Sequence, residues 1–285
     1  MPKPSTLPTF ATGTNYPADG EPEQGTATKV VPSADALANG YRPKQKPKAQ
    51  NLNYMLYWLS QWAAWAGEDK TIQIAPPAWA LEPGLTWTQN PRYVFCGAVG
   101  GGEAMYPISL PVGSILKTIT LAMEGDNVVD PVITVQKISA VGTVTATLAT
   151  RSLTNLASGW ANQLINFAAD TTPWALSVVN DPPHGVYRTT GNFITEGFAV
   201  GMTVTLSGFT NAGNNSTRVI SGLQADGLGM GFVSDTGMVA EASGGNERIV
   251  ATPITLEAGY SYVISVDSTS TGPSIGTGAL VYTPG

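Results

Sequence analysis

Few residues of this chain have the types and spacing that catalysis or metal binding requires. His184, in NDPPHGVYR, is the single histidine, and Cys96, in RYVFCGAVG, is the single cysteine. A relay between two histidines is therefore excluded, and one His with one Cys is too small a ligand set for zinc. We expect His184 to lie in a surface turn and Cys96 to be a buried, unreactive thiol. No metal or cofactor is expected.

Paired carboxylates could cleave a glycosidic bond if two of them lay about 5 to 10 Å apart. The acidic residues occur mostly in turn-like stretches, where Asp and Gly end strands. The candidates are Asp126, Asp130, Asp170, Asp181, Glu196, Asp226, Asp235, Glu241 and Glu247. The glycine cluster GAVGGGEAM is followed by neither Lys-Ser/Thr nor a helical pattern, so it predicts a turn instead of a phosphate-binding loop. We predict that the chain is not an enzyme.

Tryptophan side chains suggest a different chemistry, because an exposed indole can stack on a sugar ring. Four tryptophans are candidates for this role: Trp79, Trp87, Trp160 and Trp174. The pattern favours core or interface positions for them, and carbohydrate binding is the alternative.

The composition indicates an all-β protein. Charged residues make up only 12% of the 285 residues, and 32 Gly and 21 Pro interrupt the chain along its whole length, which is typical of many short strands joined by turns. The net charge of −6 argues against nucleic acid as a partner. The N-terminus MPKPSTLPTF has no apolar signal region, and no run reaches about 18 apolar residues, so neither classical secretion nor a membrane-spanning segment is expected.

Residues 1–50 contain eight prolines and show no sustained period of 2 or 3.6, so we expect an extended arm. The next stretch, NLNYMLYWLSQWAAWAG, has a helical period in which Leu52, Met55, Leu59 and Trp62 share one face. The expected helix is apolar around most of its circumference and too short to span a bilayer. Its surface must be covered by the chain's own β-domain, by identical helices in a homotrimer, or by another protein.

Short β-like runs follow the helix. In SILKTITLAM the residues Ile115, Ile119, Leu121 and Met123 are predicted to share one face, with Lys117 as the exception. Strands of this length, separated by turns, are typical of an antiparallel β-sandwich. We assign residues 71–173 and 251–285 to this sandwich. Residues 174–250 are predicted to form a small β-domain inserted into it.

The order of motifs in the N-terminal segment resembles that of tailed-bacteriophage fibre and other virion appendage proteins. The motifs are LPTF, then GYRP with PKAQNLN, then an aromatic helix that ends in Trp. The matching residues are Leu7, Pro8, Thr9, Phe10, Gly40, Tyr41, Pro43, Pro47, Ala49, Gln50, Asn53, Trp58, Trp62 and Trp65. The resemblance implies that residues 1–70 anchor the chain to a particle. The partner-binding residues expected from it are Phe10, Tyr41, Arg42, Lys44, Tyr54, Trp58, Trp62 and Trp65. The basic run of Arg42, Lys44, Lys46 and Lys48 is either a solvated loop or a contact with an acidic partner.

The inserted block resembles a small β-module of phage structural proteins through GNFITEGFAVGMTVTLSGFTNAGNNSTRVIS. Here Gly197 and Gly201 flank apolar residues, and Met202, Val204 and Leu206 are predicted to lie on one face of a strand. The NAGNN stretch supplies residues that tolerate positive φ in a tight loop.

These resemblances imply a non-enzymatic structural protein of a phage particle, such as a tail or collar fibre or adaptor. The alternatives are a receptor-binding protein that recognises host-surface carbohydrate through its β-domains, and a capsid decoration or head-fibre protein. The expected partners are other virion structural proteins and further copies of the chain, with a homotrimer preferred. The expected location is the virion, assembled in the host cytoplasm.

Overall fold

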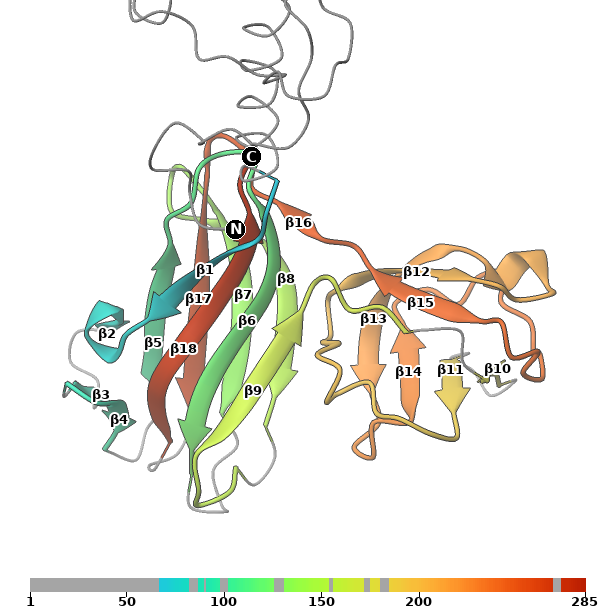
Figure 1. Cartoon of the computed structure of the whole chain (residues 1–285), viewed down its shortest axis with the longest axis horizontal. Helices are drawn as coiled ribbons and strands as arrows, with labels where there is room; N and C mark the ends of the chain where they lie inside the picture. Colours follow the sequence, from blue (N-terminus) through green and yellow to red (C-terminus); the bar gives the residue numbers. More distant parts are fainter. Residues whose placement is uncertain are drawn as a thin grey trace, which may run out of the picture. The chain divides into compact units, whose positions relative to one another are not determined.

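The computed structural model describes residues 67–81, 87–89, 91–97, 102–125, 131–153, 156–171, 175–179, 185–268 and 273–285 (Figure 1). The chain divides into two units, residues 1–68 and 69–285, and the elements below belong to the second. The predicted arm and aromatic helix lie outside the described residues, apart from the last residues of that region. The prediction of a mainly β chain with antiparallel sheets is confirmed for the described part.

The larger of two facing sheets is built around β6 (Ile115–Glu124) and β18 (Ser274–Thr283). Its order is β16 (Ile254–Thr255), β6, β18, β4 (Val94–Cys96) and β3 (Trp87–Gln89). In addition, β1 (Lys70–Ile74) pairs with β18, and β9 (Ala161–Asn166) pairs with β6. All of these pairs are antiparallel.

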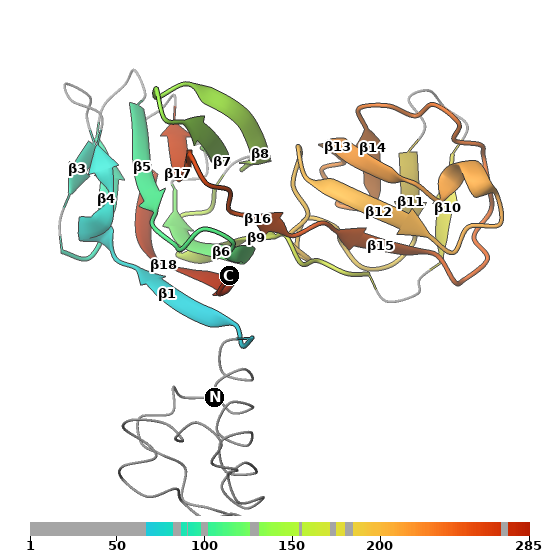
Figure 2. The ribbon, with the colours of Figure 1, turned by 90° about the horizontal axis from the view of Figure 1, so that it is seen from above.

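The second sheet of the sandwich has the order β2 (Ala80–Leu81), β5 (Gly102–Ile108), β17 (Tyr260–Ser268), β7 (Val132–Ser139) and β8 (Val144–Ser152). A short 3-10 helix, η1 (Pro76–Ala78), leads into β2. Figure 2 shows the two sheets facing each other as two layers. Their inner faces supply the core, in which Leu121, Met123, Val135 and Ile264 are fully buried.

The predicted inner face of β6 is correct for Ile119, Leu121 and Met123, which are buried, but it is wrong for Ile115. Leu116 is buried instead of Ile115. The register with β18 shifts at this point, since Val281 pairs with Thr118 and Tyr282 with Leu116. Lys117 is therefore the extra residue of a bulge, which inverts the alternation on either side of it.

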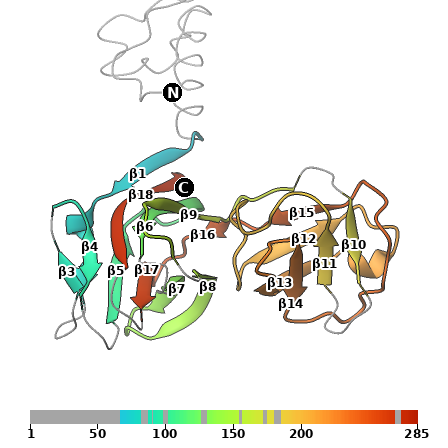
Figure 3. The same ribbon diagram turned by 90° about the horizontal axis from the view of Figure 1, so that it is seen from below.

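The inserted block forms one curled antiparallel sheet (Figure 3). Its order is β10 (Leu176–Val178), β11 (Gly185–Arg188), β14 (Gly229–Phe232), β13 (Thr217–Leu223), β12 (Thr203–Ser207) and β15 (Arg248–Ala251). A 3-10 helix, η2 (Ala212–Asn214), lies between β12 and β13. The sequence predicts that Met202, Val204 and Leu206 lie on one face of a strand; all three are buried, and Val204 and Leu206 lie on β12, while Met202 immediately precedes it. Gly197 and Gly201 both have positive φ.

The segments that enter and leave this block run side by side. The Thr171 amide donates to the Ile249 carbonyl at 2.9 Å, and the Ala251 amide donates to the Ala169 carbonyl at 2.7 Å. Asp170 and Val250 form an isolated antiparallel bridge between the same segments. The block therefore leaves and rejoins the sandwich at one place. That it folds as a separable domain stays a prediction.

Because Thr171 and Ile249 are hydrogen-bonded to each other, a short Gly/Ser loop can replace residues 172–248 without stretching the sandwich. We expect the shortened chain to keep a cooperative thermal transition, at a lower temperature than the full chain. The temperature falls because β8 loses the reciprocal hydrogen bonds between Thr150 and Val200. Calorimetry tests this, and a shortened chain that melts without cooperativity would show that the block is part of the sandwich.

Candidate functional site

The residues predicted to bind a partner lie outside the described part of the chain. They are Phe10, Tyr41, Arg42, Lys44, Tyr54, Trp58, Trp62 and Trp65. His184 and Trp174 also lie outside it. The roles assigned to these residues stay predictions.

Two of the tryptophans considered for sugar stacking belong to the core. Trp79 and Trp87 are both buried, and the ring of Trp79 packs at a tilt against Tyr106, with centroids 5.9 Å apart. Trp87 pairs in register with Cys96, which is fully buried and forms no disulfide. The prediction of a buried thiol is confirmed. Core positions, which the sequence favoured for these tryptophans, are confirmed for Trp79 and Trp87.

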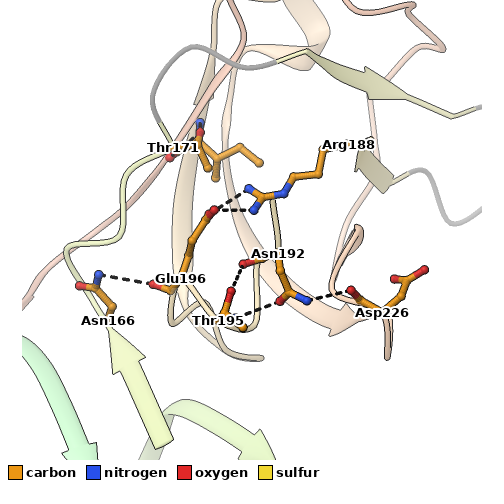
Figure 4. A network of polar contacts seen from close by, with 8 residues as sticks. Asn166, Thr171, Arg188, Asn192, Thr195, Glu196 and Asp226 are labelled. Atoms are coloured by element: carbon orange, nitrogen blue, oxygen red, sulfur yellow. Dashed lines mark hydrogen bonds and ion pairs between the residues drawn. The ribbon is translucent and has the colours of Figure 1, made fainter. Parts of the chain in front are cut away.

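Glu196 forms an ion pair with a buried arginine inside the inserted block (Figure 4). The side chain of Arg188 is 0% exposed. Its two terminal nitrogens donate to the two carboxylate oxygens of Glu196 at 2.9 and 2.5 Å. The guanidinium also lies over the ring of Phe193, 4.2 Å from the centroid. This bidentate geometry compensates for the cost of burying the arginine charge.

The turn before Glu196 is fixed by Asn192, also shown in Figure 4. The side-chain carbonyl oxygen of Asn192 accepts a hydrogen bond from the Thr195 amide at 2.9 Å. The side-chain NH₂ group of Asn192 donates to the backbone carbonyl of Asp226 at 2.8 Å. These bonds connect two loops of the block, and they place the Glu196 carboxylate against Arg188.

Glu241 holds the NAGNN loop. Its carboxylate accepts from the amides of Thr210 and Asn211 at 2.6 and 3.0 Å, and from the side chain of Asn214 at 2.8 Å. Desolvation opposes the charge, but the hydrogen bonds from Asn211, Thr210 and Asn214 outweigh it and lower the pKa of Glu241. Asn214 is fully buried and exchanges hydrogen bonds with the backbone of Val239. The carboxylate thus replaces the backbone partners that a tight loop lacks.

Glu247 and Asp170 are also engaged in scaffold contacts. The buried Glu247 carboxylate accepts from the amides of Leu176 and Gly245 at 3.3 and 2.9 Å, and from the Gly244 amide. Asp170 forms a bidentate pair with Arg248 across the connecting segments, and this hydrogen bonding lowers the pKa of Asp170. Both carboxylates therefore stabilise loops or chain crossings.

The inserted block is attached to the sandwich by backbone and side-chain contacts. One terminal nitrogen of Arg151, on β8, donates to the carbonyls of Leu164 and Ile194 at 2.7 and 2.8 Å. The Asn166 amide donates to the Gly197 carbonyl at 2.8 Å. Gly197 has φ +91°, and an added Cβ would lie 2.9 Å from the Asn166 amide nitrogen. Only glycine allows this close approach without displacement of the backbone.

A groove on the outer face of the larger sheet contains the exposed aromatic pair Tyr93 and Trp160. The ring centroids are 6.4 Å apart and the planes are tilted by 51°, and the two residues are 37% and 48% exposed. The groove has a volume of about 660 Å³. It is lined by Arg92, Tyr93, Phe95, Ala122, Glu124, Trp160, Ser274, Gly276 and Thr277. It is the candidate binding site of the described chain.

Strand pairing places these groove residues in one row. Ser274, at the start of β18, pairs with Glu124 on one side and with Phe95 on the other. Trp160 immediately precedes Ala161, whose partner is Met123, so it lies beside Glu124. Sequence reasoning named Trp160 but missed Tyr93 and Glu124, because only the pairing of β4, β18, β6 and β9 brings them together.

Within the described ranges, no group of three or more His, Cys, Asp or Glu side chains is arranged to hold a metal ion. No helix in the same residues has the length and hydropathy needed to cross a bilayer.

Replacing Glu196 with Ala should destabilise the inserted block by about 3 kcal/mol or more, because it leaves the guanidinium of Arg188, whose side chain is 0% exposed, without its carboxylate partner. Arg248→Ala is the matched control, since it breaks a bidentate pair whose side chains are 49% and 38% exposed and screened by water. Urea denaturation, followed by hydrogen exchange of β11 and β14, measures both effects. Equal losses for the two variants would show that burial of the Arg188 pair contributes nothing.

The lowered pKa of Glu241 gives its contribution to stability a defined pH dependence. The contribution is fully present above the ordinary value of 4.5 and is lost as the pH falls through the lower folded-state pKa. Glu241→Gln keeps the size of the side chain but presents an NH₂ group to N–H donors. We expect the melting temperatures of the two proteins to differ near pH 7 and to converge on acidification. A gap that stays constant down to about pH 3 would contradict this account.

No protein-family model, curated protein or solved structure matches the chain. The functional assignment therefore depends on the residues described above and on the motifs of the N-terminal segment.

Proposed function

We propose that the chain is a non-enzymatic structural protein of a tailed-phage particle, a tail or collar fibre or adaptor component. The N-terminal motifs and the glycine-rich core of the inserted block support the proposal through their resemblance to virion appendage proteins. In this role residues 1–66 attach the chain to other virion proteins, and the β region projects from the attachment point.

The observation that carries the non-enzymatic assignment is the use made of the acidic side chains. Among the nine acidic candidates for glycoside cleavage, Asp126, Asp130 and Asp181 lie outside the described residues. Four of the described ones have hydrogen-bond or ion-pair partners that hold the fold: Glu196, Glu241, Glu247 and Asp170. A general acid needs a raised pKa so that it carries a proton near neutral pH. The pKa values of Asp170 and Glu241 are instead lowered. Such carboxylates suit a rigid scaffold better than proton transfer.

The composition of residues 1–66 supports attachment to a partner. The predicted arm has too little apolar surface to fold by itself. The aromatic helix predicted after it has too much apolar surface to remain exposed to solvent. Burial of one Trp or Leu side chain contributes roughly 1.5–3 kcal/mol, and binding energy concentrates in buried Trp, Tyr and Arg. The two segments together form one proposed docking element, with a homotrimer as the preferred state of the protein.

Deletion of residues 1–66, or replacement of Trp58, Trp62 and Trp65 together by Ala, should yield a folded β region that no longer joins particles. Mass spectrometry of purified particles from complemented cells measures incorporation and copy number. The control is Trp160→Ala, which removes a tryptophan outside the docking element and should enter particles normally.

Two outcomes would contradict the proposal. Normal incorporation of the triple variant would show that these tryptophans do not dock the chain. If they only cover the chain's own sandwich, the triple variant should aggregate or melt early, while a chain without residues 1–48 should still assemble.

A further inference from the structure

We propose that the groove around Trp160 binds carbohydrate, with the apolar face of a pyranose ring stacked on the indole. This site lies in the β region and does not depend on how the chain is attached to a particle. The ligand class is a polysaccharide built from hexopyranose units.

The position of the indole is fixed by the glycine beneath it. A Cβ added to Gly276 would lie 2.7 Å from ring atom Cζ3 of Trp160 and 3.3 Å from Cε3. The ring therefore rests directly on β18, and a larger residue at position 276 would displace it. One side of the indole is held by the strand, while the residue remains 48% exposed. This leaves a pre-positioned apolar surface that faces solvent.

Exposed aromatic residues are concentrated at this groove. Among the described residues, the large apolar side chains that are exposed comprise valines, Tyr93, Trp160 and Tyr260. Single exposed apolar residues are ordinary on protein surfaces. Tyr93 and Trp160 form a pair instead, and the 51° tilt between their planes opens a concave surface suited to a ring-shaped ligand.

The polar groups around the rings match the hydroxyl groups of a sugar. Glu124 is half-buried in the groove, and no residue of the described chain donates a hydrogen bond to its carboxylate. A carboxylate accepts several hydroxyl donors, and the Ser274 and Thr277 hydroxyls can both donate and accept. Arg92 also lines the groove. A pyranose combines an apolar C–H face with a rim of hydroxyls, so it satisfies both kinds of surface.

Size and charge favour this ligand over a nucleic-acid base. The groove volume of about 660 Å³ lies in the range of roughly 300–1,000 Å³ found for small-molecule sites and admits a short oligosaccharide. A polynucleotide would bring phosphates toward Glu124 and toward a chain of net charge −6, which repels them. A neutral or weakly charged sugar meets no such penalty.

The site is also built on rigid elements. Phe95 lies on β4, Ala122 and Glu124 lie on β6, and Ser274, Gly276 and Thr277 lie on β18, while Arg92 and Tyr93 immediately precede β4 and Trp160 immediately precedes β9. A register shift between Ile275 and Gly278 places a bulge under the indole. Because bulges and paired strands hold side chains in defined directions, the groove needs little rearrangement on binding.

The full-length chain should be applied to an array that carries dextran, laminarin, a galactan and bacterial lipopolysaccharides, and the polymers that bind should then be titrated for Kd. We expect binding to at least one polymer. Trp160→Ala should weaken it at least tenfold, and Trp160→Phe should have a smaller effect. Gly276→Ala should also weaken binding, because the added methyl group pushes the indole away from the strand. Weaker binding by the Gly276→Ala chain would not be expected if Trp160 only stabilised the fold and did not contact the polymer.

Tyr260→Ala is the matched control. Tyr260 is an aromatic residue that is 40% exposed, and it lies on β17, outside the groove. It should bind like the unaltered chain, and melting curves should confirm that all variants are folded.

A blank array, or a Trp160→Ala chain that binds as tightly as the original, would overturn the proposal. If the groove instead receives another virion protein, the array would be blank and Trp160→Ala chains would fail to enter particles. If the Trp160→Ala chain loses polymer binding but still enters particles normally, the result would support carbohydrate binding at the groove independently of the docking element.

Discussion

The pairing of β18 with β6 is the interaction on which most of the described structure depends. It joins the last strand of the chain to one that lies more than a hundred residues earlier in the sequence. β18 also pairs with β1 and β4, so the sheet cannot close until the C-terminal strand is in place. Close approach is possible because Gly278 has no side chain, since a Cβ there would lie 2.6 Å from the Thr120 carbonyl oxygen. One small residue thus permits the pairing that assembles the core and the groove.

The two faces of this sheet have different roles: one face packs in the core, and the other lines the groove. Along β6, Leu121 and Met123 point into the core, while Ala122 and Glu124 belong to the outer groove. An antiparallel sheet can present one face to the core and the other to solvent, because successive side chains alternate. A change of ligand-binding residues on the outer face therefore need not disturb the packing on the inner face.

Sequence periodicity predicted the β class and several buried faces, because alternation within a strand is a local property. It predicted the shared face of Val204 and Leu206 correctly, since both lie on the uninterrupted strand β12. It failed at Ile115, because the bulge at Lys117 depends on the partner strand and not on β6 alone. The Arg188–Glu196 pair and the groove depend on contacts between strands or loops whose spatial order the sequence does not state. The position of the Trp160 ring over β18 depends on Gly276, a residue more than a hundred positions away.

The carboxylates of the chain differ in the hydrogen bonds that they accept. With only 12% charged residues, the chain has few carboxylates, and among the described residues Glu241 and Glu247 hold loops while Asp170 holds a chain crossing. Glu241 and Glu247 each collect several N–H donors, which is the role that a strand neighbour plays elsewhere in the fold. Glu124 differs from them because it stands beside an exposed indole and receives no hydrogen bond from the described residues. A half-buried carboxylate beside an exposed aromatic surface, with no hydrogen-bond donor among the described residues, is a feature that a hydroxyl-rich ligand would explain.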